Sequence, residues 1–206
     1  MITIGITGII GSGKSTVSAM LGQAGITVID LDNLAKEVSG GPAVREGIRK
    51  TFGERYLRED GTIDADRMKD LVFKDKARLG QLEGIVHPLI LAETERRVAQ
   101  EKEKGARAVI IDGPLIFEKG MNKELSKTVV VSADMATIKE RLIKRGMTRE
   151  DMERRMENQM PLEEKEKMAD YVIYNNGTED DLREELKILL EKIKIWEVAD
   201  TCILTN

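Results

Sequence analysis

The sequence predicts a three-layer α/β fold, in which helices cover both faces of a five-stranded parallel sheet. Five short apolar runs predict the strands, at residues 1–7, 26–29, 106–111, 128–131 and 170–174. Helical segments separate these runs, as crossovers between parallel strands require. The segment 33–105 contains no convincing strand and is longer than a crossover needs. We interpret it as an inserted helical lobe, which often holds a second ligand.

The beginning of the chain predicts a strand, a loop, a helix and a second strand. The first strand, 1–7, is rich in Ile and Thr, and the loop, 8–13, is rich in glycine. The helix of 14–24 has apolar residues at helical spacing and ends at Gly25. The run 26–29 follows as the second strand, and this order predicts parallel pairing through a right-handed crossover.

The remaining helices follow from periodicity and from breaker residues. Within the inserted lobe we expect helices at 33–38, 43–52, 64–73 and 76–103, the last interrupted near Pro88. The segment 134–167 is helical and rich in arginine, and we interpret it as a lid region. Residues 179–194 predict a final amphipathic helix, and 195–206 suit either a docked tail or a small extra strand. All of these parts belong to a single domain of 206 residues.

Composition excludes several classes of protein. The formal net charge of −4 argues against a nucleic-acid binder, which would usually present a basic face. The single cysteine, Cys202, excludes an internal disulfide framework and fits a reducing compartment. The apolar N-terminus lacks the basic start of a signal peptide and is too short for a membrane span. We expect a cytoplasmic protein with no membrane or nucleic-acid partner, and its oligomeric state is left open.

The turn at residues 8–15 carries the clearest functional pattern. It reads Gly8-Ile9-Ile10-Gly11-Ser12-Gly13-Lys14-Ser15 and fits G-x-x-x-x-G-K-[ST]. Glycines let backbone N–H groups turn inward around phosphate oxygens, and the next helix adds its positive end. Lys14 is expected to reach the β- and γ-phosphates, and the Ser15 hydroxyl to be a ligand of Mg²⁺. The predicted nucleotide contacts in this region are Gly8, Gly11, Ser12, Gly13, Lys14, Ser15 and Thr16.

The motif alone does not separate kinases from GTPase switches and motor ATPases. A GTPase should also carry N-K-x-D, and the nearest string, Asn122-Lys123-Glu124-Leu125, lacks the aspartate. Motor ATPases need a larger chain. The small size, the inserted lobe and the basic helical region favour an ATP-dependent P-loop kinase that acts on a small, nucleotide-like acceptor.

Two carboxylates, Asp30 and Asp32, end the second strand. Residues i and i+2 of a strand face the same side, and the carboxyl edge of a parallel sheet is where ligands bind. A kinase acting on an alcohol needs a carboxylate there to orient the hydroxyl and accept its proton. We predict that at least one of the two serves this role or holds Mg²⁺ through water. The alternative is a capping role, with Asp32 as the N-cap of a helix from Asn33.

Together with these motifs, the sequence resembles the dephospho-CoA kinase family over roughly residues 1–190. The resemblance includes the phosphate loop, the paired aspartates and a series of later motifs. These motifs are Ala35-Lys36-Glu37-Val38, Phe52-Gly53, Leu82-Glu83, His87-Pro88, Pro114-Leu115-Ile116-Phe117-Glu118, Arg141, Arg145, Arg155, Gln159 and Asn175-Asn176-Gly177. The resemblance implies transfer of the ATP γ-phosphate to the ribose 3′-hydroxyl of dephospho-CoA, with Asp32 as base. It also implies that the inserted lobe binds CoA and that the arginine-rich region is a lid.

Basic residues of the lid region are candidates for phosphate contact. Arg141 and Arg145 lie four apart on a predicted helix and share a face, and planar guanidinium groups bind phosphate oxygens in pairs. We assign Arg141 to catalysis and Arg145 to nucleotide binding. The alternative is a solvated helix, because acidic residues are interspersed among the arginines.

For five further residues, the sequence is compatible with either a ligand contact or a structural role. His87, Phe117 and Glu118 are expected to contact the acceptor. The alternative for His87 is a helix kink or a packing role, and the alternative for Phe117 and Glu118 is closing the lobe interface. Asp112 ends the third strand and orients Mg²⁺ through water, or else caps the turn that follows it. Asn175 borders the adenine, or else forms an ordinary strand-end turn.

Three residues depart from the usual pattern of the family. Ile9 stands where glycine is usual, Leu31 where alanine is usual and Lys36 where arginine is usual. A β-branched residue is poorly tolerated at positive φ, so we predict that Ile9 has negative φ and faces away from phosphate. Two other functions stay open: another nucleoside or nucleotide kinase on the same scaffold, and a nucleotide-gated binding protein with little catalysis.

Overall fold

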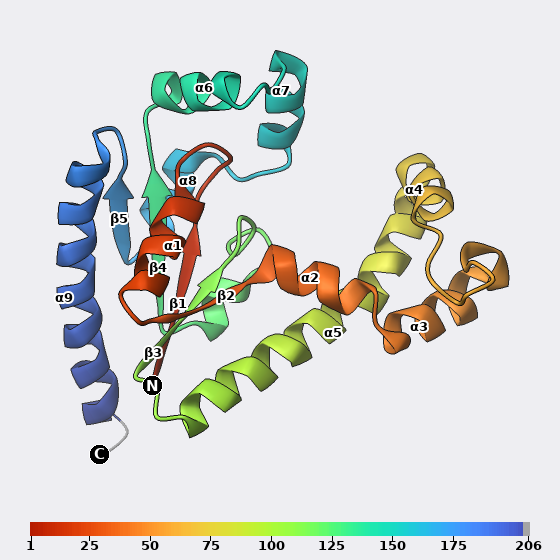
Figure 1. The fold of residues 1–206 in the computed structure, drawn as a ribbon, viewed down its shortest axis with the longest axis horizontal. Coiled ribbons are helices and arrows are strands. Elements are labelled where there is room, and N and C mark those ends of the chain that lie inside the picture. The colour runs from red at the N-terminus through yellow and green to blue at the C-terminus, as the bar shows by residue number, and fades with distance from the viewer. Residues whose placement is uncertain (204–206) are drawn as a thin grey trace. The chain divides into compact units, whose positions relative to one another are not determined.

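The computed structural model describes the backbone of residues 1–203 and the side chains of residues 1–199. Five strands form one sheet in the order β2-β3-β1-β4-β5 (Figure 1). The strands are β1 (Ile2–Thr7), β2 (Thr27–Asp30), β3 (Ala108–Asp112), β4 (Lys127–Ser132) and β5 (Tyr171–Tyr174). β1 pairs in parallel with β3 and β4, and β4 pairs in parallel with β5. The predicted five-stranded parallel sheet is confirmed.

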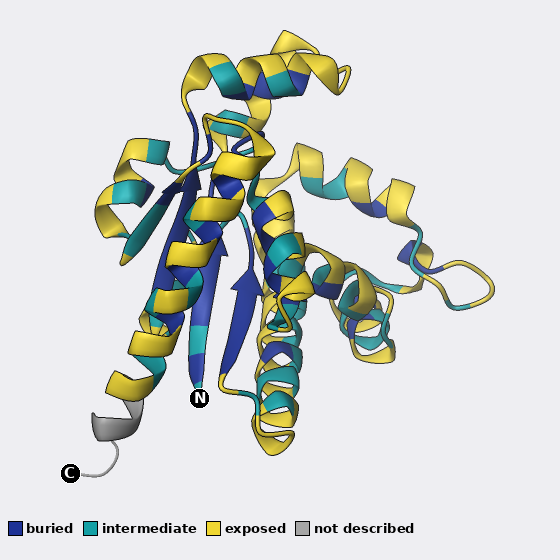
Figure 2. Cartoon of the chain, turned by 60° about the vertical axis from the view of Figure 1, so that its left-hand side comes forward, coloured by how far each residue is buried: buried dark blue, intermediate teal, exposed yellow. Residues whose placement is uncertain are grey.

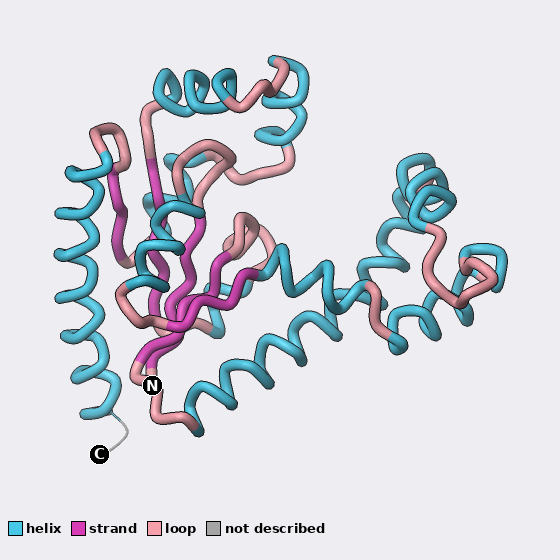
Figure 3. Tube along the Cα trace, viewed as in Figure 1, coloured by secondary structure: helices cyan, strands magenta, loops and turns pink. Residues whose placement is uncertain are grey.

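The chain forms two compact units. The first consists of Met1–Ile29 together with Gln100–Asn206, and the second is Asp30–Ala99. The sheet belongs to the first unit, whereas the second is built of helices and the loops that join them (Figure 3).

Helices cover both faces of the sheet in the first unit. Ile2, Ile4 and Ile6 of β1 pack with α1 (Lys14–Gln23) and α9 (Glu179–Ile203) in one buried cluster. Successive strand residues point to opposite faces, so Thr7 faces the other side. There it contacts Lys165 of α8 (Leu162–Met168), and Ser132 donates a hydrogen bond to Glu166 of the same helix. The sheet is therefore the middle of three layers, as its buried strands in Figure 2 indicate.

The arginine-rich region forms α6 (Met135–Lys144), α7 (Arg149–Glu157) and α8. In Figure 1, α6 and α7 lie beyond the carboxyl ends of the strands. A second apolar cluster holds them there, in which Ile138 and Leu142 of α6 and Met152 of α7 are buried with Ile9. The glycine-rich loop and the arginine-rich helices thus share a small core of their own.

The second unit contains α2 (Leu31–Ser39), α3 (Pro42–Phe52), α4 (Ala65–Lys74) and most of α5 (Lys76–Glu103). Its core is the cluster of Val44, Ile48, Tyr56, Leu57 and Met68. Two short 3₁₀ helices, Glu54–Tyr56 in this unit and Met121–Glu124 in the first, complete the helices.

Two predictions about helices were wrong. α5 runs from Lys76 to Glu103 with Pro88 inside it. The proline removes one backbone hydrogen bond and crowds the preceding turn, but it does not end the helix. α9 continues to Ile203, so residues 195–203 extend the final helix beyond its predicted end at 194 and do not form an extra strand. Its apolar side continues past Ile193 to Trp196, which packs against the main core. Residues 204–206 of that predicted tail lie outside the described part of the chain.

No helix in the described part of the chain is both long and apolar enough to cross a bilayer.

Candidate active site

The glycine-rich loop joins β1 to α1 and depends on backbone angles that favour glycine. Gly11 has φ 82°, and Gly13, the N-cap of α1, has φ 100°. A side chain at Gly13 would also collide with its surroundings, because an added Cβ would lie 2.0 Å from Nδ2 of Asn175. At Gly8 an added Cβ would lie 2.6 Å from Oγ of Ser12 and from the carbonyl oxygen of Val131. The loop is thus a close-packed backbone turn that ends at the N-terminus of a helix.

Ile9 accommodates this turn without strain. No non-glycine residue of the described chain has positive φ, so the predicted negative φ of Ile9 is confirmed. Its side chain is 8% exposed and packs in the cluster formed with α6 and α7. The β-branched residue therefore supports the loop from the side of these helices.

Lys14 and Asp112 form an ion pair at the carboxyl edge of the sheet. Asp112 is the last residue of β3 and pairs in register with Ile6 of β1, one strand over. The side chains of Lys14 and Asp112 are 18% and 5% exposed. The sheet therefore holds a buried carboxylate beside the lysine of the loop. Ser15 and Thr16 follow in the first turn of α1, where both are exposed.

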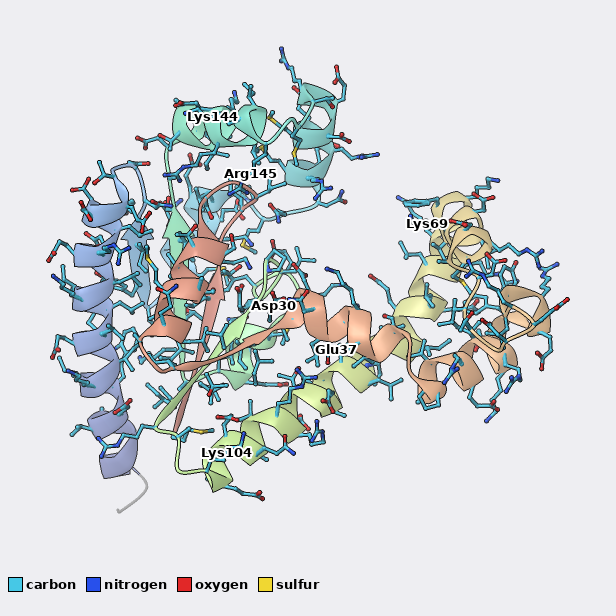
Figure 4. The ribbon with its side chains drawn as sticks, viewed as in Figure 1. Asp30, Glu37, Lys69, Lys104, Lys144 and Arg145 are labelled. Carbon is cyan, nitrogen blue, oxygen red and sulfur yellow. The ribbon has the colours of Figure 1, made fainter. Side chains whose placement is uncertain are left out.

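Asn175 and Arg141 reach the loop from two other elements. The amide of Asn175, just after β5, donates a hydrogen bond to the carbonyl oxygen of Ser12 at 2.8 Å. Arg141 of α6 donates to the same carbonyl at 3.4 Å and to Oδ1 of Asn175 at 3.3 Å. Arg145 is the C-cap of α6, one turn beyond Arg141, and is exposed (labelled in Figure 4). The structure thus brings Arg141 and Asn175 to the phosphate loop.

Two residues near the loop carry no role in the sequence analysis. Gln159 follows α7, and its Oε1 accepts a hydrogen bond from the backbone N–H of Ile10 at 3.0 Å. Lys165 of α8 is fully buried and pairs with Glu118 at 2.8 Å. Burial lowers the pKa of the Lys165 ammonium, while the Glu118 carboxylate opposes that shift. In a segment as charged as Leu162–Met168, no local signal distinguishes a buried lysine from a solvated one.

The aspartates after β2 differ from the prediction in two ways. Asp30, not Asp32, is the N-cap of α2: its Oδ1 accepts from the backbone N–H of Asn33 at 2.9 Å. Asp32 lies within the helix, where residues two apart are turned by roughly 200° from each other. The pair does not share a strand face, because the chain becomes helical at Leu31. Asp30 is occupied by capping, whereas Asp32 is exposed in the first turn.

The remaining predicted acceptor contacts lie in different surroundings. His87 is exposed on α5, with Nε2 3.9 Å from Oε1 of Glu83. Phe117 is 5% exposed. Oε1 of Glu118 accepts from the backbone N–H of Met160 at 2.8 Å and pairs with Lys165. Its Oε2 is buried without a hydrogen bond from any described residue, so it can accept one more donor.

The first strand of the parallel sheet leads into a close-packed glycine-rich loop, and Lys14-Ser15 begin the helix that follows it. Arg141 of α6 contacts this loop. This arrangement is that of a P-loop kinase. Residues 2–181 match the family described as dephospho-CoA kinase. A dephospho-CoA kinase from Aquifex aeolicus is 42% identical over 191 residues, covering 92% of this chain and 96% of that protein. The chain belongs to the dephospho-CoA kinase family.

Two solved structures extend the similarity to the fold. TT1252 from Thermus thermophilus is 39% identical, with a TM-score of 0.75, over 93% of this chain and 97% of that one. A dephospho-CoA kinase from Campylobacter jejuni is 26% identical, with a TM-score of 0.70, over 93% of this chain and 96% of that one.

Proposed function

We propose that this chain transfers the γ-phosphate of ATP to the ribose 3′-hydroxyl of dephospho-CoA, giving CoA and ADP, the final step of coenzyme A synthesis. The observation that carries the proposal is the phosphate loop of a dephospho-CoA kinase family member, with Lys14 beside Asp112 and Arg141 against the loop. Phosphoryl transfer is catalysed largely by positioning and charge stabilisation, and this arrangement provides both.

The loop and the lid region have different proposed contacts with the nucleotide. Backbone N–H groups of 11–15, with Lys14, bind the β- and γ-phosphates. Arg141 stabilises negative charge on the transferred group, and Arg145 binds the nucleotide phosphates when α6 and α7 of the predicted lid region, 134–167, close over them. Asn175 borders the adenine while it holds the loop at Ser12.

Mg²⁺ fits the oxygen donors that the site offers. The Ser15 hydroxyl is exposed at the start of α1, and the Asp112 carboxylate lies beside Lys14. Oxygen ligands of this kind, completed by water and substrate phosphates, are what Mg²⁺ prefers. When bound, the ion neutralises charge on the β- and γ-phosphates. We assign Ser15 as a direct ligand and Asp112 as a ligand through water.

The unit Asp30–Ala99 is the proposed acceptor lobe, corresponding to the predicted segment 33–105. His87 is the proposed contact to dephospho-CoA in this unit. Phe117 and Glu118, which belong to the first unit, are two further proposed acceptor contacts. The free Oε2 of Glu118 supports this role. The single cysteine supports a cytoplasmic location.

Asp32 is the proposed general base for the 3′-hydroxyl. It follows β2 by two residues and is exposed, whereas Asp30 is engaged in capping α2. Asp32→Asn should lower kcat by about 100-fold or more and leave ATP affinity within about threefold. Asp66→Asn is the matched control, because Asp66 is also an exposed aspartate at the second position of a helix. Equal kcat in both variants, measured at saturating substrates, would remove Asp32 from the mechanism.

The reaction itself is tested by coupled ADP release with ATP and Mg²⁺, in the presence and absence of dephospho-CoA. We expect release to depend on dephospho-CoA, and phosphorus NMR to locate the new phosphate on the 3′-oxygen. A panel of nucleosides and nucleoside monophosphates serves as the comparison. Faster turnover of any of these than of dephospho-CoA would contradict the proposed acceptor.

A further inference from the structure

Lys165 is buried to an unusual degree for a lysine. It lies in α8 among charged neighbours, yet its side chain is 0% exposed. An ammonium group removed from water is unfavourable unless its charge and its hydrogen bonds are satisfied. The acceptors around Lys165 are therefore informative about what this side chain does.

Three oxygen atoms surround the ammonium, which has three donors. Nζ of Lys165 lies 2.6 Å from the carbonyl oxygen of Pro114, 2.8 Å from Oε1 of Glu118 and 3.4 Å from Oγ1 of Thr7. The Thr7 hydroxyl in turn donates to the carbonyl oxygen of Pro114 at 3.1 Å. A single buried group on α8 thus contacts two other segments of the chain, the end of β1 and the turn region 113–118 after β3.

Both of these segments carry the phosphate site. Thr7 is the last residue of β1 and directly precedes Gly8, the first glycine of the loop. Pro114 follows Asp112 by two residues, and Asp112 is the partner of Lys14. Lys165 therefore contacts the Thr7 side chain where the loop leaves the sheet and the Pro114 backbone carbonyl just after β3 ends.

The segment 159–165, which ends at Lys165, also contacts the site at its beginning. Glu118, which pairs with Lys165, accepts the backbone N–H of Met160, and Gln159 accepts the backbone N–H of Ile10 in the loop. Residues 159–165, where the chain returns from the lid helices, thus contact the loop, the turn after β3 and Glu118.

Stability alone does not require this arrangement. An apolar pair of similar volume is often as stable as a buried ion pair. What an apolar pair lacks is directional donors that hold backbone atoms in place. Phosphoryl transfer is sensitive to such placement, because small displacements of the reacting groups lower the rate strongly.

We propose that Lys165 is a positioning residue for phosphoryl transfer. Through Thr7 it holds the start of the phosphate loop in place, and through Pro114 it holds the turn that follows Asp112. Glu118 supports it as counter-ion and as the anchor of Met160. This inference rests on the proposed function and adds a residue that acts without touching either substrate.

The test compares two variants, both of which carry the substitution Glu118→Gln. Glu118→Gln removes the counter-charge and any effect of that charge on the acceptor. Lys165→Met in the Glu118→Gln background then removes the ammonium without leaving a charge buried alone. We expect kcat to fall about tenfold or more from the first variant to the second, with KM for dephospho-CoA within about threefold. The melting temperature of the second variant should be no lower than that of the first, because Glu118→Gln alone leaves the Lys165 ammonium buried without its counter-ion. A kcat of the second variant within about threefold of the first would overturn the proposal; a larger loss supports it.

Lys187→Met is the matched surface control. Lys187 of α9 pairs with Glu184 at 2.7 Å, and both side chains are about 70% exposed. We expect its kcat to stay within about twofold of the parent.

A second variant keeps the proposal testable if the double variant does not fold. Thr7→Val is isosteric and removes the hydroxyl between Lys165 and Pro114. We expect kcat to fall about threefold or more, and Thr7→Ser to rescue it. Parental kcat in Thr7→Val would overturn the proposal. Absence of dephospho-CoA turnover in the parent would overturn both the inference and the proposed function, whereas an active parent with an equally active Lys165 variant overturns the inference alone.

Discussion

At the scale of single residues, the phosphate loop shows how local sequence fixes local chemistry. Its glycines were predicted from the motif, and Gly11 and Gly13 have the left-handed backbone angles that motivate glycine there. The negative φ of Ile9 was also predictable, since a β-branched residue is poorly tolerated at positive φ. The packing of Asn175 and Arg141 against the loop was not predictable from local sequence, because both come from segments more than 120 residues away.

Gly13→Ala should weaken nucleotide binding strongly, whereas Gly25→Ala should not. Both glycines have positive φ, of 100° and 87°, so both variants incur about 1–2 kcal/mol of backbone strain. Only at Gly13 would the added Cβ also meet a buried neighbour, Asn175, whereas nothing lies within 4 Å at Gly25. We expect ATP affinity, measured by calorimetry, to fall about 100-fold or more for Gly13→Ala and less than about threefold for Gly25→Ala. Similar affinity in the two variants would contradict this account of the loop.

At the scale of elements, periodicity and breaker residues located the strands and most helices to within a few residues. The start of α2 is the exception with functional consequences, since it moves Asp32 from a strand edge into a helix. The sequence could not identify the N-cap, because Asp30 and Asp32 fit the capping preference equally well and helix-compatible residues follow both.

A group of ion pairs on α5 makes the stability of the second unit depend on pH. Glu93 pairs with Arg96 at 2.7 Å and with Arg97 at 2.9 Å, and Arg97 also pairs with Glu37 of α2 (labelled in Figure 4). Hydrogen bonds from Arg96 and then Arg97 lower the pKa of Glu93 from 4.5 to about 2. A carboxylate with a lowered pKa stabilises the folded state above its unfolded pKa, and that stabilisation is lost as pH falls through the folded value.

Glu93→Gln should therefore lower stability at pH 7 and lose its effect in acid. The side chain of Glu93 is 24% exposed, so solvent screening limits the expected loss to about 1 kcal/mol at pH 7. The difference from the parent should shrink between pH 4.5 and about 2, the window set by the two pKa values. Urea unfolding followed by circular dichroism at several pH values measures it. Glu95→Gln, an exposed neighbour on the same helix, is the control, and a pH-independent difference for Glu93→Gln would contradict the assignment.

At the scale of the whole molecule, the chain divides into a unit that contains the sheet and a unit that is built of helices. The first contains the sheet, the phosphate loop and the arginine-rich helices, and the second is the segment Asp30–Ala99. Proposed roles follow this division: ATP binds the first unit, and dephospho-CoA is bound largely by the second.

Hydrogen exchange read by mass spectrometry should resolve this division. Mg²⁺ with ADP should slow exchange in residues 8–16 and 134–167, and dephospho-CoA alone should slow exchange within 30–99. Binding that orders a segment lowers its local opening, which is what exchange measures. Peptides from 179–199 of α9 serve as the internal control for both ligands. Protection by dephospho-CoA confined to the first unit would contradict the role of the second unit as acceptor lobe.

The sequence by itself determined the parallel sheet, the phosphate loop and the membership in a kinase family, because strand patterning and the loop motif are properties of neighbouring residues. Only the tertiary structure decided which side chains surround that loop. Lys165 and Gln159 are the clearest cases: their environment is set by segments distant in sequence that pack over them, including Glu118, Pro114 and Ile10. Burial and convergence are long-range consequences of packing, and no local pattern in a charged helix encodes them.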